Sequence, residues 1–170
     1  MKELGHYPIE SHLTPVDAHT FSKEGEWWRA VVRSKNQYGN ERVRLYLWRN
    51  DNQKGWVTVH KWNVQSSRWD KEKKTVKKYL NASPDSNAPY FPVQHYDVVG
   101  GETIEKTNDW WTAIVQYEDD WSSTHKTRLY MWQIEEGDAK GTGYKWNINS
   151  DTWPEERLVA NSFLESLDDN

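Results

Sequence analysis

The 170-residue sequence contains no cysteine, only two methionines and no long apolar run. Without cysteine the chain cannot form disulfides, Fe–S clusters or zinc sites built on thiolates. No apolar stretch approaches the ~18 residues that a membrane-spanning helix needs, so we expect no membrane contact. The first ten residues also lack the basic-then-apolar order of a secretory signal peptide. From these absences we expect a soluble, intracellular protein.

The chain is very polar, with a mean hydropathy of −1.06 and 28% charged residues. It nevertheless carries 12 Trp, 9 Tyr and 3 Phe, which together make 14% of the sequence. Disordered chains are poor in aromatic residues, so this composition indicates a folded protein. A chain of this length forms one domain or two small ones.

The aromatic residues reveal a tandem repeat with an offset of 83 or 84 positions. Trp27-Trp28 recurs as Trp110-Trp111, segment 44–48 (RLYLW) as 128–132 (RLYMW), and segment 61–64 (KWNV) as 145–148 (KWNI). The spacing is constant across the whole unit, which chance resemblance does not produce. We therefore expect a basic repeat over residues 1–80, a turn-rich linker over 81–89 and an acidic repeat over 90–170.

Charge is divided unevenly between the two repeats. Residues 1–80 hold 16 Lys and Arg against 9 Asp and Glu, a net charge of +7. Residues 81–170 hold 6 against 17, a net charge of −11. A basic half is typical of proteins that contact nucleic acid or another polyanion. Two oppositely charged halves can equally attract each other, and the sequence leaves both interpretations open.

Each repeat has the pattern of four strands followed by a helix. Period-two alternation predicts strands over 27–33, 42–49 and 56–64. Segment 8–21 is either one bent strand or two short ones, with the bend at Pro15 and at the matching Gly100-Gly101 in the second repeat. Segment 69–80 has helical spacing after a capping box at Ser67-Arg68-Trp69-Asp70. We expect an α+β fold with two tandem ββββα repeats, each an antiparallel sheet with one helix packed on a face, which form an intramolecular pseudo-dimer.

One strand face combines cations and aromatic rings in both repeats. It carries Arg42, Arg44, Tyr46 and Trp48 in the first repeat and Lys126, Arg128, Tyr130 and Trp132 in the second, and we expect Trp27 and Arg29 to extend it. Aromatic rings stack unpaired bases for roughly 1–3 kcal/mol per base, and cations neutralise phosphates. These ten side chains predict a surface for single-stranded DNA or RNA. The same rings could instead form cross-strand pairs or pack against the sister repeat.

The sequence offers no pattern that indicates catalysis. Its six histidines show no metal-ligand spacing, and it has no phosphate-cradling glycine loop and no nucleophile elbow. We therefore expect no catalytic residue, no metal and no cofactor. Two alternatives to nucleic-acid binding remain. One is a carbohydrate or small-ligand binding module that uses exposed Trp. The other is a protein-interaction module that self-associates through its basic and acidic halves.

The tandem ββββα pattern resembles the Whirly architecture, which PUR-repeat proteins and the positive-cofactor-four type of transcriptional coactivator share. The resemblance is one of topology and rests on segments 27–33, 42–48, 56–64 and 69–80 with their partners in the second repeat. The Lys-Gly-Lys-Ala-Ala-Leu run of plant Whirly proteins is absent. The resemblance implies binding of single-stranded DNA or RNA on sheet faces, with helices that pack the units together.

Overall fold

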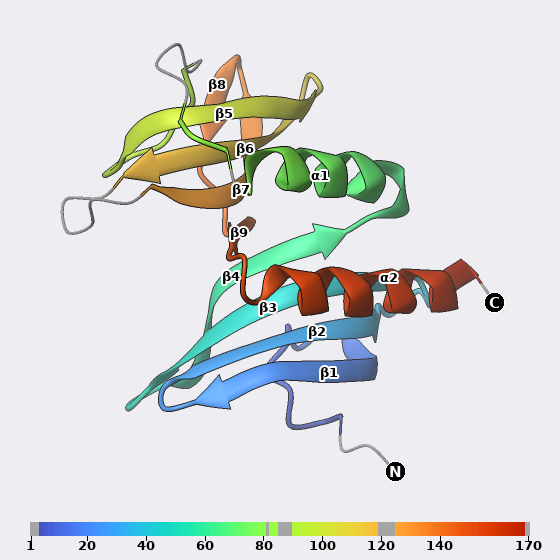
Figure 1. The fold of residues 1–170 in the computed structure, drawn as a ribbon. Helices are drawn as coiled ribbons and strands as arrows, with labels where there is room; N and C mark the ends of the chain where they lie inside the picture. The colour runs from blue at the N-terminus through green and yellow to red at the C-terminus, as the bar shows by residue number, and fades with distance from the viewer. Residues whose placement is uncertain (1–3, 81, 85–89, 119–124, 169–170) are drawn as a thin grey trace. The chain divides into compact units, whose positions relative to one another are not determined.

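The computed structural model describes residues 4–80, 82–84, 90–118 and 125–168. Asn81 and residues 85–89 of the expected linker therefore lie outside the described residues. The first repeat contains β1 (Thr14–Glu24), β2 (Trp27–Lys35), β3 (Glu41–Asp51), β4 (Gly55–Val64) and α1 (Ser66–Tyr79). The second contains β5 (Asp97–Lys106), β6 (Trp110–Glu118), β7 (Lys126–Glu135), β8 (Asp138–Lys140), β9 (Lys145–Ile148) and α2 (Trp153–Asp168) (Figure 1).

The strands form two antiparallel sheets. The first has the order β1-β2-β3-β4, and the second has the order β5-β6-β7-β8 with β9 also paired to β7. The α+β class and the tandem order of strands followed by a helix are confirmed. In the second repeat the expected fourth strand is divided into two short strands, β8 and β9, which both pair with β7.

Local signals in the sequence predicted one feature correctly and one incorrectly. The register of β1 against β2 shifts between Pro15 and Asp17, and that of β5 against β6 shifts between Val98 and Gly100, so the expected bends are confirmed. The capping box is wrong because α1 begins at Ser66, which leaves Ser67 inside the helix. The Gln65 carbonyl accepts a hydrogen bond of 2.8 Å from the Trp69 amide, so the hydrogen bonds of the helix start earlier in the chain than expected.

The chain divides into two compact units that do not coincide with the sequence repeats. Unit 1 comprises residues 1–69 and 154–170, and unit 2 comprises residues 70–153. Each unit therefore combines the sheet of one repeat with most of the helix of the other repeat. In unit 1, α2 lies across one face of the β1–β4 sheet (Figure 1), where Glu156 accepts a hydrogen bond from Arg29.

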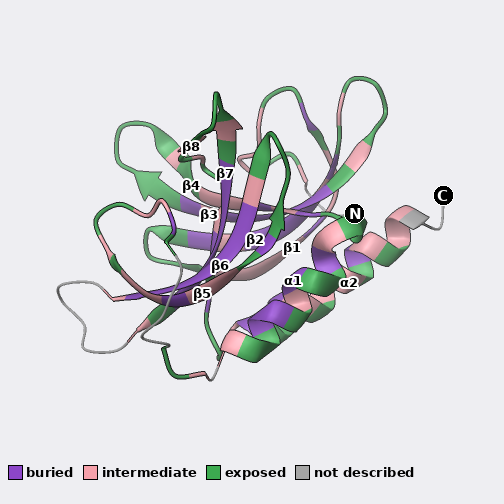
Figure 2. Ribbon diagram, turned by 90° about the horizontal axis from the view of Figure 1, so that it is seen from above, coloured by how far each residue is buried: buried purple, intermediate pink, exposed green. Residues whose placement is uncertain are grey.

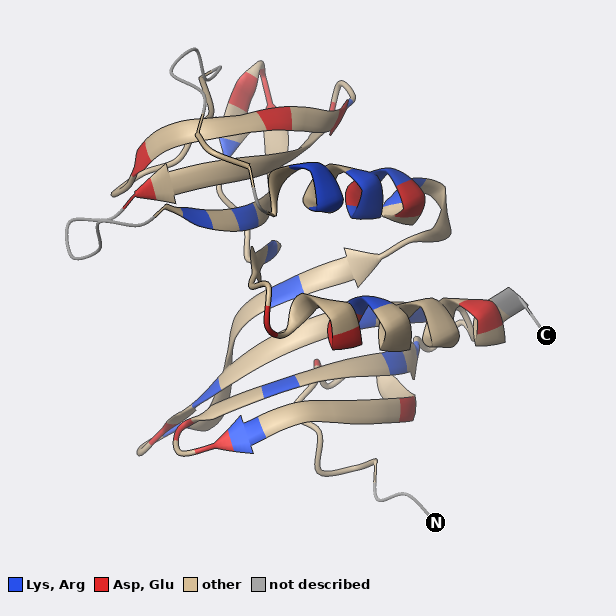
Figure 3. Ribbon diagram, viewed as in Figure 1, with Lys and Arg blue, Asp and Glu red and all other residues tan. Residues whose placement is uncertain are grey.

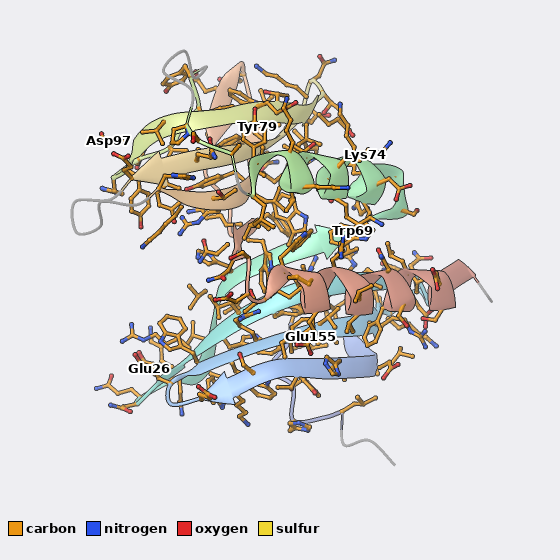
Figure 4. All side chains as sticks on the ribbon, viewed as in Figure 1. Glu26, Trp69, Lys74, Tyr79, Asp97 and Glu155 are labelled. Carbon is orange, nitrogen blue, oxygen red and sulfur yellow. The ribbon has the colours of Figure 1, made fainter. Side chains whose placement is uncertain are left out.

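Further contacts hold each helix to its sheet. Glu155 in the first turn of α2 (labelled in Figure 4) has its Oε1 atom 3.1 Å from Nε2 of His19 on β1. In unit 2, the Lys78 Nζ atom donates to Glu102 over 2.7 Å. The Gln116 side-chain amide donates to the backbone carbonyls of Tyr79 and Ala82, which lie 3.4 and 3.0 Å away.

The exchange of helices evens out the charge. Unit 1 holds 12 Lys and Arg against 12 Asp and Glu, and unit 2 holds 10 against 14, so the net charges are 0 and −4. The lysines of α1 join the sheet of the acidic repeat (Figure 3). The acidic residues of α2 join the sheet of the basic repeat. The opposite charges of the two repeats are thus brought together within each unit.

Both faces of each sheet are covered. A helix covers one face, which we call the helix face, and an irregular segment covers the other, which we call the arm face. The first arm, residues 4–13, packs Leu4, Tyr7 and Ile9 against buried residues of unit 1. The second arm, residues 90–96, places Phe91 and Val93 against the equivalent cluster of unit 2. Figure 2 shows that buried residues run along the central strands of the sheets.

Candidate functional site

Strand register decides on which face each expected site residue lies. Ala30 of β2 pairs with Tyr46 of β3, whereas Arg29 pairs with Leu47. Because neighbouring residues of a strand point to opposite faces, Tyr46 lies on the arm face while Arg29 and Trp27 lie on the helix face. The prediction that Trp27 and Arg29 extend the aromatic-basic surface is therefore wrong. The Arg29 guanidinium instead pairs with a carboxylate of α2.

The aromatic-basic face of each strand is buried. The exposed fractions are 3% for Arg44, 0% for Tyr46, 0% for Trp48, 8% for Arg128, 3% for Tyr130 and 2% for Trp132. The expected open stacking surface is therefore not present in this structure, because the two arms cover these six side chains. Of the ten residues that we expected at the surface, Trp27, Arg42 and Lys126 are exposed. Arg42 lines a separate pocket of about 320 Å³ with Asn63 and Leu164.

In unit 1 the arm face carries a packed set of rings. Tyr46 stacks on Trp48 with ring centroids 5.0 Å apart and planes inclined by 12°, and Trp48 lies 4.9 Å from Trp28. The first arm adds two rings on Trp28, namely Tyr7 at 5.1 Å and His6 at 5.8 Å with planes inclined by 11°. The Trp28 indole N–H donates to the Thr20 hydroxyl over 2.9 Å, which satisfies its polar edge.

Unit 2 repeats this arrangement. Tyr130 stacks on Trp132 with centroids 5.2 Å apart and planes inclined by 5°, and Trp132 lies 5.0 Å from Trp111. Phe91 of the second arm stacks on Trp132 at 6.1 Å and takes the place that Tyr7 has in unit 1. The Trp111 indole N–H donates to the Thr103 hydroxyl over 2.9 Å. In both units the arm thus adds at least one ring to a set supplied by the sheet.

Cations beside the rings of unit 1 hold a carboxylate of the first arm. Glu10 accepts hydrogen bonds from Arg44 at 3.1 Å, from the Tyr46 hydroxyl at 2.7 Å and from Lys61 at 3.3 Å. Burial raises the pKa of the Glu10 carboxyl. The hydrogen bond from Tyr46 and the charges of Arg44 and Lys61 outweigh that effect, so the net pKa lies below its usual value. Burial raises the pKa of the Tyr46 hydroxyl, which keeps it a donor.

The equivalent cations of unit 2 have a different environment. Arg128 donates from Nε to Asn147 over 2.5 Å and from a terminal nitrogen to the Tyr130 hydroxyl over 3.1 Å. The Lys145 Nζ atom lies 5.7 Å from the centroid of the Tyr130 ring. Burial is the main cause that lowers the pKa of Lys145, and the positive charge of Arg128 lowers it further. At the position that corresponds to Glu10 the sequence has Gln94, which is exposed.

Several residues of this site were not among those expected from the sequence. The first arm supplies Tyr7 and Glu10, and the second arm supplies Phe91. The side chains that face each Arg-Tyr pair are Lys61 with Asn63 and Lys145 with Asn147. Two repeated segments held the signal, namely Pro8-Ile9 with Pro92-Val93 and Lys61-Trp62-Asn63 with Lys145-Trp146-Asn147. Recurrence of such short segments in both copies indicated that each has a structural or functional role.

Within the described ranges, no group of three or more His, Asp or Glu side chains could hold a metal ion. No helix in the same part of the chain is both long and apolar enough to cross a membrane. No protein-family model matches the sequence, and a search of curated proteins finds no match. The side chains of the two arm faces are therefore the available evidence on function.

Proposed function

We propose that the protein is a binding module for single-stranded nucleic acid, DNA or RNA, and that the arm faces contact it when the arms are released. One observation carries the proposal: the first arm places a ring, Tyr7, on Trp28 and a carboxylate, Glu10, between Arg44 and Lys61. A nucleotide presents the same two groups, a planar ring and an anionic pair of oxygens. The arm face of unit 1 therefore has the groups that stack a base and neutralise a phosphate.

In this proposal the arm competes with the ligand for the same face. When the competent conformation is only a fraction of the population, the apparent affinity falls by that fraction. Substitutions that weaken the arm without touching the sheet should therefore tighten binding. Tyr7 and Glu10 are the residues to change, because they make the ring and ion contacts of the first arm.

The test is a titration with mixed-sequence single-stranded DNA and RNA at low salt, followed by Trp fluorescence. We expect quenching in the wild type, affinity that falls steeply with salt, and binding at least about tenfold tighter in a Y7A/E10Q variant. Tyr38 is 80% exposed in a turn, so Y38A is the matched control and should bind as the wild type does. If neither the wild type nor Y7A/E10Q shows quenching, the proposal is wrong. Salt-insensitive binding of oligosaccharides would favour the carbohydrate alternative.

We also propose that the two repeats act as an intramolecular pseudo-dimer, with residues 1–80 and 90–170 as the duplicated units. The exchange of helices and the equivalent ring sets of the two arm faces support this proposal. It predicts two nucleic-acid contact faces in each chain, which the stoichiometry of the same titration measures. A single face per chain in Y7A/E10Q with F91A added would contradict it.

A further inference from the structure

The two units share a triad of Arg, Tyr and Lys on their arm faces. Arg44, Tyr46 and Lys61 form it in unit 1, and Arg128, Tyr130 and Lys145 form it in unit 2. The backbone positions are equivalent, since Tyr46 pairs with Lys61 across the sheet as Tyr130 pairs with Lys145. Each Arg also donates from Nε to the facing Asn, over 2.6 Å in unit 1 and 2.5 Å in unit 2. The two triads are therefore built in the same way.

The triad of unit 1 is occupied by a carboxylate that belongs to the chain itself. All three of its side chains donate to Glu10, at distances between 2.7 and 3.3 Å. The arrangement shows which chemical group such a triad holds. It is an oxyanion with two oxygens, small enough to fit between a guanidinium, a phenol and an ammonium group.

The triad of unit 2 has no such partner from its own arm. The arms correspond, because the Ile9 amide donates to the Tyr7 carbonyl over 2.9 Å and the Val93 amide donates to the Phe91 carbonyl over 2.8 Å. The next residue is Glu10 in the first arm and Gln94 in the second, and the amide carries no charge. Among the residues that the structure describes, no carboxylate pairs with Arg128 or Lys145.

Aromatic rings compensate only part of the charge in unit 2. The Arg128 guanidinium lies 4.9 to 5.6 Å from the ring centroids of Tyr96, Tyr117 and Tyr130. Such contacts contribute about 0.5–2 kcal/mol, but they do not use the remaining N–H donors of a guanidinium. Arg128 is 8% exposed. Lys145 is half-buried, and two neighbouring cations with so little access to water are unfavourable until an anion joins them.

We propose that Arg128, Tyr130 and Lys145 form an oxyanion-binding site of unit 2, which takes a carboxylate or phosphate group of a ligand. The bound oxygens would occupy the place that corresponds to the Glu10 carboxylate in unit 1. The Tyr130 hydroxyl accepts from Arg128 and so directs its own proton toward the anion. This site goes beyond the proposed function, because a lone oxyanion binds there without a base to stack.

The test is an NMR titration of the full chain with sodium acetate and, separately, with sodium phosphate, at ionic strength held constant with sodium chloride. We expect saturable shifts at the Arg128 Nε–H and at the amides of Tyr130 and Lys145, with no saturable shift at the Arg44 Nε–H. The two titrations identify whether the site prefers a carboxylate or a phosphate, and saturation by either supports it. Shifts that stay linear with both anions would overturn the proposal.

Two variants add a carboxylate to the arm of unit 2 or remove it from the arm of unit 1. In Q94E the second arm supplies the carboxylate itself, so anion affinity at Arg128 should fall at least about tenfold, which is about 1.4 kcal/mol. In E10Q the unit 1 triad opens, so a saturable shift should appear at Arg44. Gln94 is exposed, so Q94E is expected to fold. Anion binding by Q94E with wild-type affinity would overturn the proposal, whatever oligonucleotide titrations show.

Discussion

The Tyr46 hydroxyl donates a hydrogen bond of 2.7 Å to the Glu10 carboxylate and so connects the first arm to the sheet of unit 1. Arg44 and Lys61 approach the same carboxylate. The first arm is therefore held by a charge as well as by apolar contacts of Tyr7 and Ile9. A charge that titrates gives this contact a dependence on pH that apolar packing does not have.

Acidification should weaken the first arm. Although burial alone raises the pKa of Glu10, the net pKa lies below the ordinary value of 4.5. Its contribution to stability is therefore complete above that value and is lost as pH falls through the lowered pKa. At neutral pH we expect E10Q to lower the free energy of unfolding by about 2 kcal/mol, because Arg44 is left buried without this carboxylate. Urea denaturation across acidic pH measures this. A difference between wild type and E10Q that stays constant well below pH 4.5 would contradict the assignment.

The Arg29–Glu156 pair should be strongly coupled. Glu156 of α2 is 1% exposed and Arg29 of β2 is 23% exposed. Removing the Arg29 guanidinium therefore takes away a positive charge that stabilises the buried Glu156 carboxylate. We expect R29M to cost about 3 kcal/mol and the R29M/E156Q double variant to show a coupling of about 1–3 kcal/mol. A double-mutant cycle by urea denaturation measures it, and additive costs would contradict it.

The His19–Glu155 contact is the matched control for that cycle. It also joins β1 to α2, but its side chains are 44% and 57% exposed. Solvent screens such a pair, so H19Q should change the free energy of unfolding by less than about 0.5 kcal/mol.

The strands and their order could be predicted from the sequence because their signals are local. The alternation around Trp28 and Val32 and the recurrence of the RLYLW segment place β2, β3, β6 and β7 within a few residues of their observed bounds. The bend at Pro15 is equally local, since proline disrupts a strand ladder wherever it lies. These features depend on neighbouring residues and so need no knowledge of the tertiary structure.

The exchange of helices could not be predicted from the same patterns. An apolar stripe on α1 shows which side of the helix is buried, but it does not show which sheet buries it. Charge was the available clue: α1 is rich in lysine, and the sheet that receives it offers Glu102 to Lys78. The sign of the charge asymmetry thus indicated the partner, while the sequence alone left polyanion binding as an equal explanation.

The burial of the arm faces depends on contacts between distant residues. Alternation placed Arg44, Tyr46 and Trp48 on one face, which is correct, and their polarity suggested that this face meets solvent. Glu10 lies 34 residues before Arg44 and neutralises it. Such a pairing has no periodic signal. The β2–β3 register likewise decides on which face of the sheet Trp27 lies. The turn between the two strands sets that register, and alternation within either strand does not specify it.

A side chain at Gly101 should disrupt the bend of β5. Gly101 has a φ of 135°, and a Cβ there would lie 2.3 Å from the Ile114 carbonyl oxygen, which belongs to the neighbouring strand. We expect G101A to cost about 3 kcal/mol or more. Gly141 has no atom within 4 Å of such a Cβ, so G141A should stay within about 0.5 kcal/mol of the wild type. Thermal denaturation of the two variants makes the comparison, and equal stability would contradict the strain at Gly101.

Each arm should protect the rings of its own sheet. Phe91 is 2% exposed and fills the ring set of unit 2, so F91A should cost about 3–4 kcal/mol. Tyr7 is only half-buried, so Y7A should cost about 1–2 kcal/mol. Hydrogen exchange of two indole N–H groups separates the effects, because Trp111 donates to Thr103 and Trp28 donates to Thr20, each over 2.9 Å.

F91A should accelerate exchange at the Trp111 indole and leave the Trp28 indole close to its wild-type rate, while Y7A should do the reverse. The reason is that each ring packs on the indole of its own unit, at 5.9 Å for Phe91 on Trp111 and 5.1 Å for Tyr7 on Trp28. Local opening of one arm then exposes one indole without global unfolding. Equal acceleration at both indoles in either variant would mean that the arms open only when the whole chain unfolds, and a ligand could not reach the arm faces of the folded protein.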